Sequence, residues 1–180
     1  MPDSCRACPL GFCYSAADCT GKAEDSEMSH NSDALCHALA EQLRARGWRL
    51  VTAESCTGGG IAAACTDLPG SSEWFECGFV TYSNKAKVRD LAVPQDVLDH
   101  HGAVSEETVR AMVAGALRYG DLAVAVSGIA GPGGAVPGKP VGTVWIAWGS
   151  AEGTEAQCYC FDGDRSNVRH MTIGTALKNL

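Results

Sequence analysis

The sequence contains no apolar run of the roughly 18–20 residues that a membrane-spanning helix requires. Basic residues are also scarce, since 14 Lys and Arg stand against 21 Asp and Glu, for a formal net charge of −7 at pH 7. Proteins that bind a nucleic-acid backbone depend on patches of Lys and Arg. We therefore expect neither a membrane nor a nucleic acid as partner, while a small anionic ligand held by a few local groups stays open.

Three common ligand-binding motifs are missing as well. The segment GGAVPGKP (133–140) resembles a P-loop, but Pro140 stands where a Ser or Thr would bind Mg²⁺. No G-x-G-x-x-G lies between a strand and a helix, so a Rossmann cofactor site is unsupported. The five His residues form no H-E-x-x-H or comparable ligand set. The sequence therefore predicts neither a resident metal nor a cofactor.

Cysteine, by contrast, is plentiful, with ten residues in the chain. No secretion signal accompanies them, because PLGFCYSAA (9–17) is short and is interrupted by Pro9 and Gly11. Several of the cysteines lie in apolar segments, where free Cys behaves as a small hydrophobic residue. We therefore expect free thiols and a reducing, cytoplasmic compartment.

The first 30 residues differ from the rest of the chain, because they lack any hydrophobic period. They hold a group of four cysteines: Cys5, Cys8, Cys13 and Cys19. This group could ligate zinc, but a second C-x-x-C and a well-placed His are missing. Residues 1–30 are therefore interpreted as a Cys-rich, disordered extension that precedes a folded domain of residues 31–180.

From Asp33 onward, helical and apolar segments alternate. Helices are expected over 33–46, 58–66, 84–93, a short turn from Pro94, 105–119 and 166–180. Buried strands are expected over 48–53, 74–83, 121–128, 142–149 and 155–161, the last two forming a hairpin. Helices interleaved with strands predict an α/β protein, a three-layer α/β/α sandwich with a mixed sheet.

The segment LVTAESCTGGGIAA (50–63) places Ser55 at the end of a buried strand, ahead of Thr57 and three glycines. Its hydroxyl would then lie at the carboxyl edge of the sheet, where open α/β sheets bind ligands, and the amides that follow could hold an oxyanion or a phosphate. A serine nucleophile needs a base, and a desolvated lysine from TYSNKAK (81–87) could supply it. The residues alone leave a plain helix cap open, and such caps are common.

Cys56 is the neighbouring candidate for a nucleophile. Adjacent side chains near a strand end point to opposite sides. If Ser55 faces the site, Cys56 is therefore expected to pack into the core.

Six segments together resemble the C-terminal domain of the CinA (competence/damage-inducible) family: TAESCTGG, LPGSSEWFECGFVTYSNKAK, HGAVSEETV, SGIAGPGG, KPVGTVWIAW and FDGDR. The resemblance covers about residues 33–180. Stand-alone members of that family are nicotinamide-nucleotide amidases, whereas longer members carry an additional N-terminal pyrophosphatase-type domain. The resemblance thus implies metal-free hydrolysis of nicotinamide mononucleotide to nicotinic acid mononucleotide and ammonia, in pyridine-nucleotide salvage, by a homodimer or larger homo-oligomer.

The same resemblance assigns catalytic roles to three residues. Ser55 corresponds to the family's nucleophile, Lys87 to its general base and Tyr82 to a third group that orients Lys87 or relays a proton. Lys85 is an extra lysine without a role. The amides of Thr57, Gly58 and Gly59 are expected to stabilise the oxyanion.

The nucleotide itself would be recognised by further residues of the matching segments. Arg165 and Arg169 are four apart, hence on one helical face, and could pair with the phosphate; a solvated or carboxylate-paired arginine is the alternative. Gly131, in the GIAGPGG loop, could offer close backbone approach or serve only as a turn. Ser105 is expected to cap a helix first and to contact a ligand second.

Two functions of other classes stay open. One is a catalytically silent regulatory or ligand-binding module linked to competence or DNA damage. The other is an interaction protein that binds zinc through the N-terminal cysteines.

Overall fold

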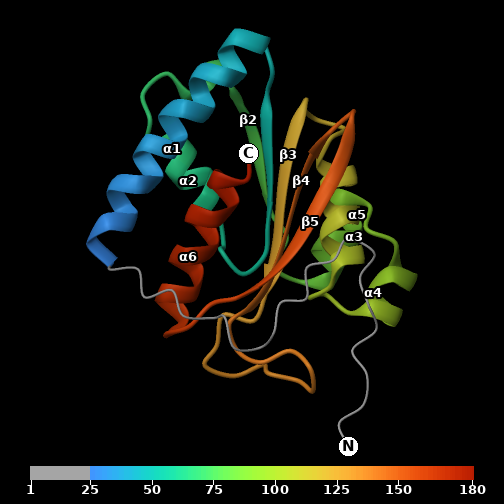
Figure 1. Cartoon of the computed structure of the whole chain (residues 1–180). Coiled ribbons are helices and arrows are strands. Elements are labelled where there is room, and N and C mark those ends of the chain that lie inside the picture. Colours follow the sequence, from blue (N-terminus) through green and yellow to red (C-terminus); the bar gives the residue numbers. More distant parts are fainter. Residues whose placement is uncertain (1–24) are drawn as a thin grey trace, which may run out of the picture.

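The computed structural model describes the backbone of residues 25–180 and the side chains of residues 32–180 (Figure 1). Its helices are α1 (Asp25–Arg46), α2 (Gly60–Thr66), the 3₁₀ helix η1 (Ser71–Glu73), α3 (Asn84–Leu91), α4 (Gln95–His101), α5 (Glu106–Ala116) and α6 (Arg165–Lys178). Its strands are β1 (Leu50–Glu54), β2 (Phe75–Val80), β3 (Leu122–Gly128), β4 (Thr143–Ser150) and β5 (Gly153–Cys160). No helix in this part of the chain is long and apolar enough to cross a membrane.

The five strands form one sheet in the order β2-β1-β3-β4-β5. β1 pairs in parallel with both β2 and β3, and Glu54 at its end lies beside Val80 of β2 and Val126 of β3. β4 runs antiparallel to β3, and β5 returns beside β4 as a hairpin. The mixed sheet is therefore confirmed, and the carboxyl ends of its three parallel strands meet at one edge.

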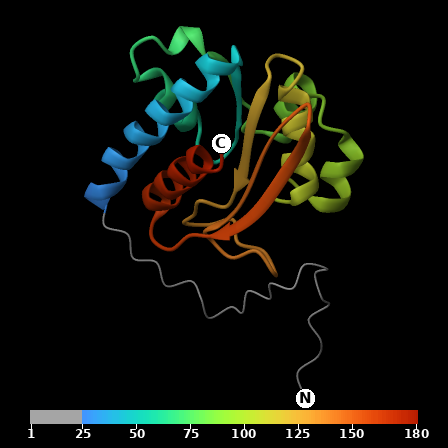
Figure 2. The ribbon, with the colours of Figure 1, turned by 45° about the horizontal axis from the view of Figure 1, so that its top comes forward.

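Helices cover both faces of the sheet: α1, α2 and α6 lie on one side, and α3, α4 and α5 on the other (Figures 1 and 2). Alternate residues of β1 serve the two layers, because successive side chains of a strand point to opposite faces. Leu50 packs with Leu39 and Leu43 of α1, whereas Val51 packs with residues of α5 such as Met112. This arrangement confirms the predicted three-layer α/β/α sandwich.

The predicted first residues of two helices, α1 and α2, are wrong. α2 begins at Gly60, because Gly58 and Gly59 have φ angles of +62° and +96° that a right-handed helix cannot contain. α1 begins at Asp25 and not at Asp33, so the predicted boundary between residues 30 and 31 falls inside it. The candidate zinc ligands Cys5, Cys8, Cys13 and Cys19 lie outside the described residues.

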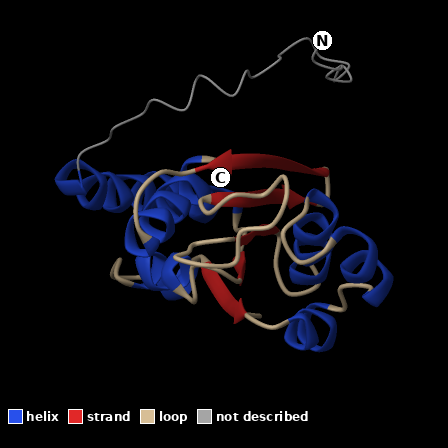
Figure 3. Ribbon diagram, turned by 90° about the horizontal axis from the view of Figure 1, so that it is seen from below, coloured by secondary structure: helices blue, strands red, loops and turns tan. Residues whose placement is uncertain are grey.

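The carboxyl edge of the parallel strands is where the candidate residues gather. β1, β2 and β3 end there, and α6 begins there after β5. Residues 129–142, the orange loop beneath the sheet in Figure 1, cover part of the same edge. Viewed from below in Figure 3, the strands lie between the two groups of helices. The fold thus collects loops from four separate parts of the chain around the residue that follows β1.

Candidate active site

Ser55 follows the last residue of β1 and is buried. Its amide donates to the Val126 carbonyl at 3.1 Å, which continues the pairing of β1 with β3 by one residue. This bond holds the Ser55 backbone at the carboxyl edge of the sheet.

Lys87 lies in the first turn of α3 and is fully buried. Its Nζ donates to Ser55 Oγ at 2.9 Å and to the Thr81 carbonyl at 2.7 Å. The start of α3 is set by Ser83, whose hydroxyl accepts a bond from the Ala86 amide at 3.1 Å. The cap fixes α3 close behind β2, and the structure thereby brings Lys87 to Ser55. Lys85, two residues earlier, is exposed.

The environment of Lys87 disfavours its charged form. Burial lowers the pKa of Lys87 to about 8 from an ordinary 10.5, against a small opposing effect of the nearby Cys56 thiol. Both hydrogen-bond partners of Nζ are neutral oxygens, and no carboxylate within residues 32–180 bonds to it. Neutral amine therefore becomes plentiful as the pH approaches 8, well below the ordinary lysine value, and a neutral amine can accept the proton of a serine hydroxyl.

Glu54 is a fully buried carboxylate that the sequence interpretation did not single out. Oε2 accepts bonds from the Thr57 hydroxyl (2.7 Å), the Gly59 amide (3.0 Å) and the Ile61 amide (3.1 Å). Oε1 accepts one from the Ala62 amide at 2.8 Å. The sequence does carry a signal for this role, an acidic residue at the end of an otherwise apolar strand. A carboxylate that is buried there needs several hydrogen-bond donors close by.

These bonds correct the predicted set of oxyanion amides. The Gly58 amide donates to the Ser55 carbonyl at 3.1 Å, and the Gly59 amide is held by Glu54. Neither is free for a ligand. Within residues 32–180, the amides of Cys56 and Thr57 donate to no oxygen; they face the Cys56 sulfur, and both residues are buried.

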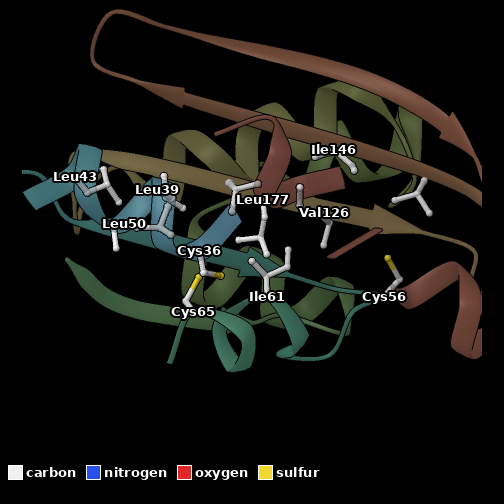
Figure 4. Close-up of a cluster of buried hydrophobic side chains, with 14 of the residues drawn as sticks. Cys36, Leu39, Leu43, Leu50, Cys56, Ile61, Cys65, Val126, Ile146 and Leu177 are labelled. Atoms are coloured by element: carbon white, nitrogen blue, oxygen red, sulfur yellow. The ribbon is translucent and has the colours of Figure 1, made fainter. Parts of the chain in front are cut away.

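Cys56 lies in the core, as expected, with a side chain that is 5% exposed. Figure 4 shows it at one end of the apolar cluster that includes Ile61 and Val126. Burial raises the pKa of the Cys56 thiol to about 11, with the adjacent amides and Lys87 lowering it in part. A thiol in this environment is a poor nucleophile near neutral pH.

The predicted contact between Tyr82 and Lys87 is not present. Tyr82 is 60% exposed, and its hydroxyl accepts a bond from Arg165 Nη2 at 3.1 Å. The Thr81 carbonyl, and not the Tyr82 hydroxyl, accepts a bond from the Lys87 amine. The reason is the alternation of side chains in extended chain, which turns Thr81 inward and Tyr82 outward.

Arg165 and Arg169, in the first two turns of α6, both reach the edge of the sheet. Arg165 Nη1 donates to the Gly131 carbonyl at 2.9 Å, and Arg169 Nη2 donates to the Thr57 carbonyl at 2.8 Å. Among the described residues, neither forms an ion pair with a carboxylate. Arg165 and Gly131 also line an open hollow of about 490 Å³ between the 130–132 loop and the start of α6. The structure thus brings Arg165, Gly131 and Tyr82 together, and sets Arg169 on the loop of Ser55.

Two further residues have structural partners. Ser105 caps α5, accepting a bond from the Thr108 amide at 3.2 Å and donating to the Gly102 carbonyl at 3.0 Å. Lys139, the lysine of the P-loop-like segment, donates to the His101 and Val104 carbonyls. Within the part of the chain that the structure describes, no group of three His, Cys, Asp or Glu could hold a metal ion.

Comparison with known proteins gives consistent matches over this domain. The family model described as "CinA C-terminal domain" matches residues 32–180. "Nicotinamide-nucleotide amidohydrolase PncC" of Pseudomonas putida is 53% identical over 148 residues, which are 81% of this chain and 92% of that protein. The protein of the same name from Escherichia coli K12 is 49% identical over 159 residues, or 87% and 94% of the two chains. The solved competence/damage inducible protein CihA from Agrobacterium tumefaciens superposes with a TM-score of 0.80 at 41% identity, covering 83% of this chain and 93% of that one.

Replacement of Lys87 by Met is expected to raise the stability of the fold at neutral pH, because it removes a buried ammonium and keeps a similar volume. The folded pKa of about 8 lies below the ordinary 10.5, so the unfolded chain binds the proton more tightly. The loss of folding stability that Lys87 causes is therefore fully present below pH 8 and disappears as the pH rises toward 10.5. Denaturant unfolding at several pH values would measure it.

Lys85→Met is the matched control, since its side chain is exposed and its replacement should leave the pH dependence unchanged. A Lys87→Met variant with the same pH-dependent stability as the unmodified chain would contradict the lowered pKa of Lys87.

Proposed function

The chain belongs to the CinA C-terminal domain family, and from that membership we propose that it hydrolyses nicotinamide mononucleotide to nicotinic acid mononucleotide and ammonia. The observation that carries the proposal is the 2.9 Å hydrogen bond between the buried Lys87 amine and Ser55 Oγ. The names of the two amidohydrolase relatives supply the substrate.

In the first half of the reaction, Ser55 Oγ attacks the carboxamide carbon of the nicotinamide ring and transfers its proton to the neutral Lys87 amine. The Thr81 carbonyl, 2.7 Å from Nζ, keeps the amine directed at the serine. Negative charge develops on the carboxamide oxygen, and the amides of Cys56 and Thr57, which bond to no oxygen of the described residues, are the donors that we assign to it.

In the second half, the C–N bond breaks and the protonated Lys87 gives its proton to the departing nitrogen, which leaves as ammonia. The nicotinoyl group then forms an ester with Ser55. Water, deprotonated by the now neutral Lys87, attacks this ester and releases nicotinic acid mononucleotide. Ser55 recovers its proton from Lys87, so the cycle consumes one water and needs no metal or cofactor.

The phosphate of the substrate is assigned to Arg165. This side chain is exposed at the hollow beside the 130–132 loop and is held by two neutral oxygens, those of Gly131 and Tyr82. A guanidinium in such a position has further N–H donors for a phosphate. Arg169 is committed to the Thr57 carbonyl, which favours a role in the nucleophile loop over a phosphate contact for this second arginine.

Several broader features belong to the same proposal. We place the activity in pyridine-nucleotide salvage in the cytoplasm, carried out by a homodimer or larger homo-oligomer. Residues 1–30 are proposed as an extension to the catalytic domain of residues 31–180, with α1 (Asp25–Arg46) continuous across that boundary.

Ser55→Ala and Lys87→Met are each expected to lower ammonia release from nicotinamide mononucleotide by at least ~10³-fold, because the two groups act as one unit. Lys85→Met should keep the activity of the unmodified chain, since its side chain is exposed. Ammonia release can be followed in a coupled assay, with simple amides as alternative substrates.

Full activity of Ser55→Ala would overturn the serine mechanism. An essential Lys85 with a dispensable Lys87 would show that the wrong lysine has been assigned. Absence of ammonia release from the unmodified chain would favour the silent regulatory module.

Arg165→Gln is expected to raise KM for nicotinamide mononucleotide by about 10-fold or more, because a charge-assisted bond to phosphate is lost. The same variant should hydrolyse nicotinamide riboside, which has no phosphate, as well as the unmodified chain does. Arg118→Gln is the control, because Arg118 is exposed and lies just after α5, on the other side of the sheet from α6. Equal effects of Arg165→Gln on both substrates would remove Arg165 from the phosphate site.

A further inference from the structure

Glu54 is a second ionisable group buried beside the nucleophile, and the proposed reaction gives it no step. Its side chain has no exposed area, and it forms no ion pair with a Lys or Arg among the described residues. All four of its hydrogen bonds come instead from the six residues that begin with Thr57 and end with Ala62. The carboxylate is therefore bound by the segment that follows Ser55.

The four donors to Glu54 come from two neighbouring segments of the chain, the loop after Ser55 and helix α2. The Thr57 hydroxyl and the Gly59 amide belong to the loop, whereas the Ile61 and Ala62 amides belong to the first turn of α2. Amides in a first helical turn have no partner within the helix. The residue before α2, Gly59, has no side chain to cap it, so Glu54 supplies the cap from the preceding strand. Ser55 lies inside the ring that these bonds close.

Bonds from outside the ring hold the same loop. The Ser55 amide is fixed to Val126 of β3, and Arg169 of α6 donates to the Thr57 carbonyl. The Gly59 amide is bonded to Glu54 and the Gly58 amide to the Ser55 carbonyl, whereas the Cys56 and Thr57 amides face the Cys56 sulfur. The carboxylate thus withholds the Gly59 amide from a substrate.

We propose that Glu54 is a positioning residue for the hydrolysis, an inference that rests on the proposed function. Its carboxylate fixes the 55–60 loop, so that Ser55 Oγ stays within hydrogen-bonding distance of Lys87 and the Cys56 and Thr57 amides keep their places beside Ser55. Glu54 acts through the loop and does not touch the substrate.

The chemistry of the four bonds requires a carboxylate at this position. Both oxygens of Glu54 face donors only: three at Oε2 and one at Oε1. A glutamine has the same shape, but its NH₂ group would meet at least one N–H or O–H donor in either orientation. Glu54→Gln therefore disturbs the loop without creating a cavity.

The test follows two quantities in Glu54→Gln: steady-state hydrolysis of nicotinamide mononucleotide, and the rate at which an uncharged fluorophosphonate labels Ser55, identified by mass spectrometry. We expect both kcat and the labelling rate to fall roughly 10²-fold, because small displacements of a reacting group have effects of this size. KM should not change, since no substrate contact is removed. Thr57→Val, which removes a single donor to Glu54, should give a smaller loss of the same kind.

Two controls separate positioning from stability. Leu39→Ala opens a cavity in the core under α1 and should lower the melting temperature without slowing the labelling of Ser55 in the folded protein. Glu76→Gln makes the same chemical change at a half-exposed carboxylate of β2 and should affect neither rate.

Unchanged labelling of Ser55 in Glu54→Gln, or in Thr57→Val should the first variant not fold, overturns the inference. A rise in KM with unchanged kcat also overturns it. If the unmodified chain is labelled at Ser55 but releases no ammonia from nicotinamide mononucleotide, the proposed function fails while the labelling rates still decide the role of Glu54. If Ser55 of the unmodified chain is not labelled at all, both proposals fail.

Discussion

The Lys87 amine is closed off from water, with Ser55 Oγ at 2.9 Å and the Thr81 carbonyl at 2.7 Å as its hydrogen-bond partners. A buried ammonium is costly, and this cost lowers the pKa of Lys87 to about 8. The surrounding fold maintains the burial: β2 ends just before Thr81, and a serine cap starts α3 two residues later. Burial of the Lys87 amine costs folding stability, and the same burial lowers its pKa and so suits the amine to the role of base proposed for Ser55.

A second buried ionisable group, Glu54, precedes Ser55 in the chain and does not pair with Lys87. Glu54 receives donors from the Ser55 loop and α2, whereas Lys87 contacts only neutral oxygens. An ion pair between them would favour the charged amine and raise its pKa, which would weaken it as a base at neutral pH. Separate partners therefore let one charge organise the loop while the other group stays reactive.

The sheet and two of the site residues could be predicted from the sequence, whereas the hydrogen-bond partners within the site could not. Apolar periodicity indicated the strands and the mixed sheet, because side-chain alternation is a local property. The sequence also offered Ser55 and the lysines of TYSNKAK as candidates. It could not tell which loop amides bond to other groups of the protein, since that depends on the acceptors that the folded chain brings to them. The roles of Glu54 and the outward turn of Tyr82 escaped prediction for the same reason.

The central claim is that the neutral amine of Lys87 activates Ser55, and its most direct test is the pH dependence of Ser55 labelling by the uncharged fluorophosphonate. Only groups of the protein titrate in this reaction, so the profile reports the base of the free enzyme. The account predicts a labelling rate that rises with pH and reaches half its maximum near pH 8, the pKa of the buried amine. A rate that does not change across that region, or that rises only near the ordinary lysine value of 10.5, would contradict it.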